Sequence, residues 1–133
     1  MAGKLRRALQ ASATAALMTA AGLAVTSAPA QAAALGCPYP YTCLYDFEKN
    51  LDHRYQVVTS GFQSVSNGAA VVYGVNSRND DVVYVRYTNG LIRCMPSGQP
   101  NKIYDVGYFG ITNGIRIDSA STCAYPTIPG PST

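Results

Sequence analysis

The clearest pattern of apolar and polar positions lies in the middle of the chain, where Val83, Val85 and Tyr87 alternate with Tyr84 and Arg86. Successive side chains of a β-strand point to opposite faces, so this alternation predicts a strand with one face in a core and the other toward solvent. Further short segments are rich in β-branched and aromatic residues and are separated by Gly, Asn, Ser and Pro. The strands predicted in this way span 42–47, 54–59, 69–75, 81–88, 90–95, 102–109 and 113–118.

No window of the sequence carries the apolar stripe of an amphipathic helix. Seven short strands separated by turn residues predict an all-β sandwich or barrel. Asn89-Gly90 lies between two of them and is typical of a hairpin turn. The order strand, turn, strand, Gly-aromatic loop occurs at 43–65 and again at 85–110, which suggests two related β motifs packed together.

The N-terminal segment has the features of a secretory signal peptide. Its early basic residues are Lys4, Arg6 and Arg7. A long uncharged run follows and closes at Ala30 and Ala32, the small residues that a signal peptidase recognises, so we expect cleavage within about two residues of Ala32. The alternative is an uncleaved membrane anchor, because an apolar run of about 20 residues is just long enough to span a bilayer.

Cleavage would divide the chain into a signal peptide at 1–32, one domain at 33–124 and a proline-rich tail at 125–133, which we expect to lie flat or disordered. The leader carries three of the ten Lys and Arg and none of the seven Asp and Glu, so the remainder has a net charge of 7 − 7 = 0. A neutral domain lacks the clustered cations that bind nucleic acid or anionic membranes. We therefore expect a secreted monomer without either partner.

Four cysteines in an exported chain predict two disulfides, for which three connectivities exist. We favour Cys37 with Cys43, because Pro38 and Pro40 restrict the short segment between them. The other bridge would then join Cys94 to Cys123 and close a loop of about 30 residues, worth about 3 kcal/mol in a chain-entropy account.

The sequence has few residues of the kinds that form metal, redox or catalytic sites. His53 is the only histidine, too few for a zinc site of the usual composition, and no Cys-x-x-Cys redox motif occurs, so we expect no metal or cofactor. His53 has no catalytic constellation that the sequence fixes, so an enzyme is not expected and a small hydrolase is the remotest alternative. Tyr39, Tyr41 and Tyr45 either form a sugar-binding platform or are half-buried on a sheet face.

Several motifs together resemble a known family. They are "CPYPYTCLY" from Cys37, "SRNDDVVYVRY" from Ser77, "IRC" from Ile92 and "GITNGIRI" from Gly110. In this combination the chain resembles the small secreted actinobacterial peptidase inhibitors of the Streptomyces metalloproteinase inhibitor type. The resemblance implies a βγ-crystallin-like sandwich of two Greek-key motifs, stapled by disulfides, that inhibits extracellular metallopeptidases.

The resemblance also implies an inhibitory loop at Arg93, Cys94, Met95 and Pro96. In the family, a cysteine-tethered loop offers its protease a bond with cysteine on the carbonyl side and a bulky apolar residue on the amine side, which here are Cys94 and Met95. A loop held by a disulfide and a proline loses little entropy on binding, which favours inhibition. The alternative is that Met95 is a buried methionine at a strand end.

Relatives with the crystallin-like fold also bind calcium through an Asn/Asp pair followed by Ser or Thr. Asn79, Asp80 and Asp81 supply suitable oxygens, but the hydroxyl residue does not follow, and a solvated turn is the other interpretation. The alternative function is accordingly a non-inhibitory crystallin-like binding or structural module of the cell envelope or medium.

Overall fold

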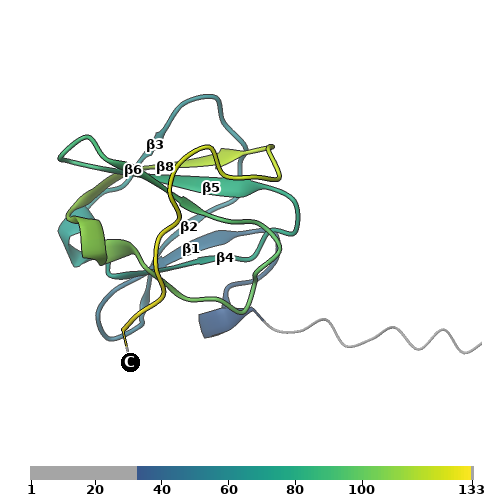
Figure 1. Cartoon of the computed structure of the whole chain (residues 1–133). Helices are drawn as coiled ribbons and strands as arrows, with labels where there is room; N and C mark the ends of the chain where they lie inside the picture. The colour runs from purple at the N-terminus through teal and green to yellow at the C-terminus, as the bar shows by residue number, and fades with distance from the viewer. Residues whose placement is uncertain (1–32, 133) are drawn as a thin grey trace, which may run out of the picture.

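The structure is a computed structural model that describes residues 33–132, so the signal peptide expected at 1–32 lies outside the described residues. It contains two antiparallel sheets of four strands each (Figure 1). The first sheet has the order β2 (Leu51–Tyr55), β1 (Thr42–Tyr45), β4 (Tyr73–Asn76) and β7 (Tyr104–Asp105). The second has the order β3 (Gln63–Ser64), β8 (Thr112–Asp118), β5 (Val82–Tyr87) and β6 (Ile92–Met95). The all-β prediction is confirmed.

The two halves of the chain have the same strand order, and each gives its third strand to the other. In the first half β2, β1 and β4 are neighbours, whereas β3 lies in the second sheet; in the second half β6, β5 and β8 are neighbours, whereas β7 lies in the first sheet. Within each half, the chain therefore crosses to the other sheet before the third strand and returns after it. We call this arrangement the third-strand exchange.

Apolar side chains from both sheets meet in one core, which makes the molecule a sandwich. Its fully buried members include Leu44 from the first sheet and Val85 and Ile115 from the second. As predicted, Val83, Val85 and Tyr87 face this core. Tyr84 on the opposite face is nevertheless buried too, because Phe62 and the Cys94–Cys123 bridge pack over it.

Some strand boundaries differ from the prediction. A strand was predicted at 54–59, but β2 spans Leu51–Tyr55. It begins in a segment that lacks clear alternation, and residues 56–59 lie outside it. β3 was not predicted, because it has only two residues. The segment 102–109 holds the two-residue β7 followed by the 3-10 helix η3 (Val106–Phe109). Two further short 3-10 helices among the described residues are η1 (Ala34–Gly36) and η2 (Gly68–Ala70).

Both disulfides have the favoured pairing, with Cys37 bonded to Cys43 and Cys94 to Cys123. The first bridge lies in a small cluster with Tyr45 and Val75 on the outer face of the first sheet. The second lies on the outer face of the second sheet. The bridges therefore fasten opposite faces of the sandwich.

The C-terminal tail is an integral part of the domain. The backbone N–H of Cys94 donates to the carbonyl of Pro126 over 2.9 Å, and the N–H of Ile128 donates to the carbonyl of Cys94 over 2.9 Å. The side chain of Ile128 is fully buried in the main core. The packed domain thus continues past residue 124, where the sequence placed its end, because the tail runs beside β6 (Figure 1).

Candidate interaction site

The four residues predicted as an inhibitory loop lie in and just after β6. Cys94 and Met95 are both 0% exposed, and Met95 belongs to the main core. Arg93 is half-buried, with its guanidinium 4.6 Å from the centre of the Phe109 ring. The carbonyls of Met95 and Pro96 each accept a hydrogen bond from Asn76 Nδ2 over 3.2 Å. In the structure these four residues therefore form the end of β6 and the position that follows it, and not an exposed loop.

β6 would be an outer strand of its sheet if the tail did not cover it. Because the tail takes both backbone groups of Cys94, the positions that an extended peptide partner would pair with are already used. The sulfur of Met95 also packs against the backbone of β4, since a Cβ built on Gly74 would lie 2.9 Å from it. In this conformation Met95 fills the core, as the alternative interpretation of the sequence supposed.

The turn considered for calcium has a different role in the structure. The Asp81 carboxylate accepts two hydrogen bonds from Arg78, one of them from Nε over 2.7 Å. The Asp81 carbonyl accepts a hydrogen bond from Asn76 Nδ2 over 2.9 Å. Residues 33–132 contain no group of three or more His, Cys, Asp or Glu arranged to hold a metal ion.

Arg78 connects this turn to two other segments. Its Nη1 donates to the carbonyl of Pro40 over 2.7 Å and to the carbonyl of Gln56 over 3.0 Å. Pro40 lies inside the loop closed by the first disulfide, and Gln56 follows directly on β2. Because Asp81 holds the guanidinium from the other side, Arg78 acts as a clamp between the staple loop and the end of β2.

The residues directly after β2 form a surface segment with two exposed apolar side chains. We call residues 56–60 the crossing segment, because the chain here leaves the first sheet and passes to β3 in the second (Figure 1, where the β2–β3 connection rises above the second sheet). Val57 is 63% exposed and Val58 44% exposed. Two adjacent β-branched apolar side chains are thus presented to solvent.

The backbone of the crossing segment is held to the body of the domain on both sides of these valines. Arg78 binds the carbonyl of Gln56, and Gln63 Nε2 donates to the carbonyl of Val57 over 3.1 Å. Val58 forms a parallel bridge with Ile117 of β8, whose carbonyl accepts the N–H of Thr59 over 3.2 Å. The segment is therefore exposed but fixed.

His53 has a polar neighbour on each side. Its Nε2 lies 3.0 Å from the Ser66 hydroxyl, and its Nδ1 lies 3.3 Å from an Asp52 carboxylate oxygen. Within the described residues Nδ1 is not aligned for a hydrogen bond. The Ser66 hydroxyl lies on an exposed turn, so the three residues form a surface contact between β2 and the segment before η2.

The three tyrosines near the first disulfide do not form one platform. Tyr39 is exposed, and Tyr41 is half-buried with the Arg54 guanidinium 4.5 Å from its ring centre. Tyr45 is buried and donates its hydroxyl to the carbonyl of Leu35 over 3.2 Å, and burial raises the pKa of this hydroxyl. The three rings thus differ in exposure, and only Tyr41 is half-buried as the alternative interpretation expected.

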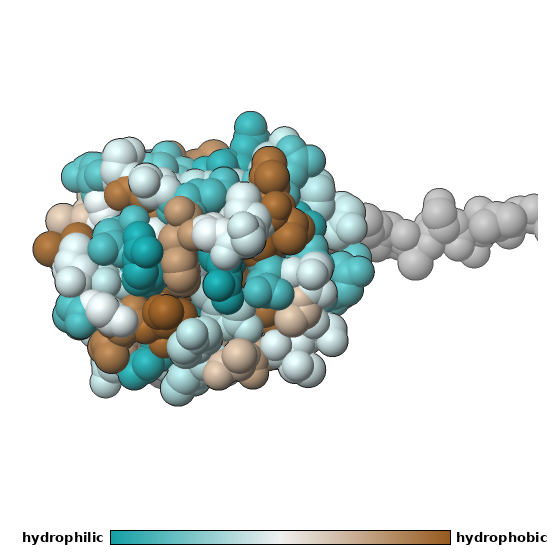
Figure 2. Space-filling view, turned by 90° about the horizontal axis from the view of Figure 1, so that it is seen from above, coloured by the Kyte–Doolittle hydropathy of each residue, from teal (hydrophilic) through white to brown (hydrophobic). Residues whose placement is uncertain are grey.

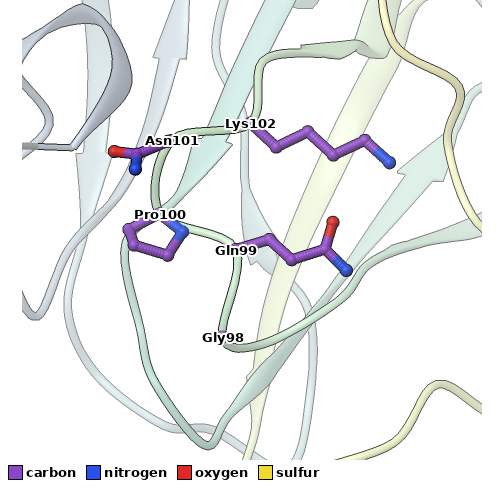
Figure 3. Close-up of a pocket in the computed structure, with 5 residues that line it drawn as sticks. All are labelled: Gly98, Gln99, Pro100, Asn101 and Lys102. Atoms are coloured by element: carbon purple, nitrogen blue, oxygen red, sulfur yellow. The ribbon is translucent and has the colours of Figure 1, made fainter.

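A shallow hollow lies beside the turn between β6 and β7 and is lined by residues 98–102 (Figure 3). Figure 3 shows the side chains of Gln99 and Lys102 extending to the same side of the turn and Asn101 pointing the other way. All its lining residues are consecutive, so groups from separate elements do not converge on a ligand.

Other apolar side chains are also exposed on the described surface. Figure 2, which looks at the molecule from above the second sheet, shows separate apolar patches among polar residues. The other large apolar side chains exposed on the described surface are Tyr39, Phe47, Leu51, Leu91, Tyr108, Ile111 and Tyr125. Phe47 and Leu51 resemble Val57 and Val58 in being two exposed apolar residues close together in sequence. They lie in the β1–β2 hairpin, at the opposite end of β2 from the crossing segment.

Comparison with known proteins gives no relative for this chain. No protein-family model matches it, and neither the curated proteins nor the solved structures contain a match. Within residues 33–132, no helix has both the length and the apolar character needed to cross a bilayer.

The sequence did not single out the residues of the clamp and the crossing segment. Val57 and Val58 had the composition of a strand interior, which normally predicts burial. Arg78 stands beside an acidic turn and had no distinctive spacing. Gln63 acts through a contact six residues away that depends on how the chain turns between the sheets.

Proposed function

We propose that the chain is a secreted, non-enzymatic inhibitor of an extracellular metallopeptidase, built on a βγ-crystallin-like sandwich of two Greek-key motifs. The observation that carries this proposal is the third-strand exchange between two halves of identical strand order. It supports the resemblance found in the sequence, because that family's fold consists of two such motifs.

The arrangement within each half supports the Greek-key assignment. In a Greek key the fourth strand returns to lie beside the first. Here β4 pairs with β1, and β8 pairs with β5. The third strand of each motif then pairs with the fourth strand of the other motif.

The two disulfides support secretion. Disulfides persist in oxidising compartments, and the described cysteines are all paired. An inhibitor that works among proteases also benefits from bridges on both faces, because local opening exposes backbone to cleavage.

The burial of Met95 favours the second candidate function, a non-inhibitory crystallin-like module. It also limits the first candidate, since an inhibitor with this conformation must contact its protease through another segment. Both functions share the same fold, so an activity measurement has to separate them.

We expect the purified domain from residue 33 to reduce the activity of a thermolysin-like protease stoichiometrically, whereas subtilisin-like and trypsin-like proteases remain active. Titration of each enzyme with increasing amounts of the domain, followed by residual hydrolysis of a peptide substrate, measures this. A domain with its disulfides reduced and alkylated serves as the control. Full activity of all three enzymes at a large molar excess would contradict the inhibitor function and leave the non-inhibitory module.

A further inference from the structure

We propose that the crossing segment is the part of this molecule that enters the protease, with Val57 and Val58 occupying apolar pockets of the active-site cleft. This inference rests on the proposed function and names its contact surface. The occupant is the concave, substrate-binding cleft of an endopeptidase that accepts branched apolar side chains.

The crossing segment combines exposure with rigidity. Val57 and Val58 are 63% and 44% exposed, although the carbonyls of Gln56 and Val57 are both fixed by side chains from the body of the domain. Thr59 pairs with Ile117 and its hydroxyl donates to the carbonyl of Gly61 over 2.7 Å, which fixes the far end. A segment already held in its bound shape loses little entropy when a partner binds.

The chemistry of the segment fits a cleft better than a flat surface. It belongs to the connection between β2 and β3, which rises above the second sheet (Figure 1). Apolar side chains on such a connection bury most area inside a concave pocket, and protein pockets are mostly apolar. The nearby Tyr39 is also exposed, and its neighbour Pro40 shares Arg78 Nη1 with Gln56, so the staple loop lies beside the segment and widens the contact.

The same hydrogen bonds explain why the segment would resist cleavage. A peptidase polarises the carbonyl of the bond that it cuts. The carbonyls of Gln56 and Val57 are engaged by Arg78 and Gln63 and so face the body of the domain. The bonds at 56–57 and 57–58 are therefore protected, and the segment blocks the cleft as a wedge.

The test compares two double variants with the unmodified domain against the protease that it inhibits. Val57→Ser with Val58→Ser removes the proposed anchors, and Phe47→Ser with Leu51→Ser makes a matched change at 77% and 52% exposed positions of the hairpin. We expect the first to weaken the inhibition constant by about tenfold or more and the second to leave it within about threefold. Thermal unfolding of both variants verifies that they are folded.

A smaller loss in the valine variant, or an equal loss in the hairpin variant, would overturn this inference while the proposed function stands. Absence of inhibition by the unmodified domain would overturn both.

Gln63→Leu provides a readout that a purely structural role would not change. It frees the Val57 carbonyl, so we expect prolonged incubation with the protease to cut this variant within residues 56–60, whereas the unmodified domain stays intact there. Mass spectrometry of the products identifies the bond. Rapid cleavage of the unmodified domain at the same place, or none in the variant, would overturn the wedge.

Discussion

Met95 is packed in the main core, with its sulfur against the backbone of β4 at Gly74. A Cβ at Gly74 would lie 2.7 Å from a methyl of Val106 and 2.9 Å from the Met95 sulfur, so this part of the core has no spare room. Close packing of this kind makes the loss of even a few atoms costly. The residue therefore contributes to stability through its shape and volume.

Met95→Ala should lower the free energy of unfolding by about 2 to 5 kcal/mol, because it leaves a cavity in a fully buried site. Denaturant unfolding measures this, with Leu91→Ala on the exposed β5–β6 turn as a control that changes stability little. Inhibition by the folded fraction should be unchanged. A Met95→Ala domain that is fully stable but no longer inhibits would instead restore the Cys94–Met95 loop as the contact site.

At the level of elements, the C-terminal tail acts as an additional edge for β6. Its prolines lack an N–H but retain carbonyls, and these accept hydrogen bonds from Cys94 and Asp105. Between them Ile128 supplies both an N–H for the Cys94 carbonyl and a side chain for the core. The tail thus forms backbone hydrogen bonds with β6 of the second sheet and with β7 of the first, and covers the side of the sandwich where these two strands lie.

Ile128→Ala should destabilise the domain by about 2 kcal/mol or more, the usual result when a large aliphatic side chain is truncated in a core. Pro131→Ala, at an exposed position three residues later, should change stability by less than about 0.5 kcal/mol. Thermal and denaturant unfolding of the two variants decide this. Equal stability of both would mean that the tail lies on the domain without supporting it.

The strands could be predicted wherever several alternating residues lie together, as at Val83, Val85 and Tyr87. The disulfide pairing could be predicted because Pro38 and Pro40 favour the local bridge. The burial of Ile128 could not be predicted, since a single apolar residue among prolines gives no periodic pattern of apolar positions. The crossing segment could not either, because the hydrogen bonds that hold Val57 come from Arg78 and Gln63, which reach it only after the sheets have packed.

For the molecule as a whole, two core tyrosines link stability to alkaline pH. Burial raises the pKa of Tyr104 to about 12, and its hydroxyl has no hydrogen-bond partner among the described residues. Burial also raises the pKa of Tyr87, whose hydroxyl donates to the carbonyl of Val106 over 2.8 Å. In each case the folded state favours the neutral phenol.

Because these pKa values are higher in the folded state, their contribution to stability is complete below about pH 10, where an unfolded tyrosine titrates, and is lost as the pH rises toward 12. Through Tyr104 alone, the free energy of unfolding should fall by about 1 kcal/mol between pH 8 and pH 11. Tyr104→Phe should remove that part of the decline without loss of stability at pH 8, whereas Tyr39→Phe, at an exposed site, should not. Denaturant unfolding at both pH values tests this, and an identical decline in the two variants would contradict it.

The third-strand exchange has a consequence for how such a molecule folds and arises. Neither half can complete a four-stranded sheet from its own residues, because β3 and β7 each finish the sheet of the other half. Docking of the halves and completion of the sheets are therefore one event, which favours all-or-none folding over stepwise assembly. A single motif could close its sheet only by trading this strand with a second copy of itself. The chain is thus equivalent to a strand-swapped dimer whose two subunits have been joined into one polypeptide.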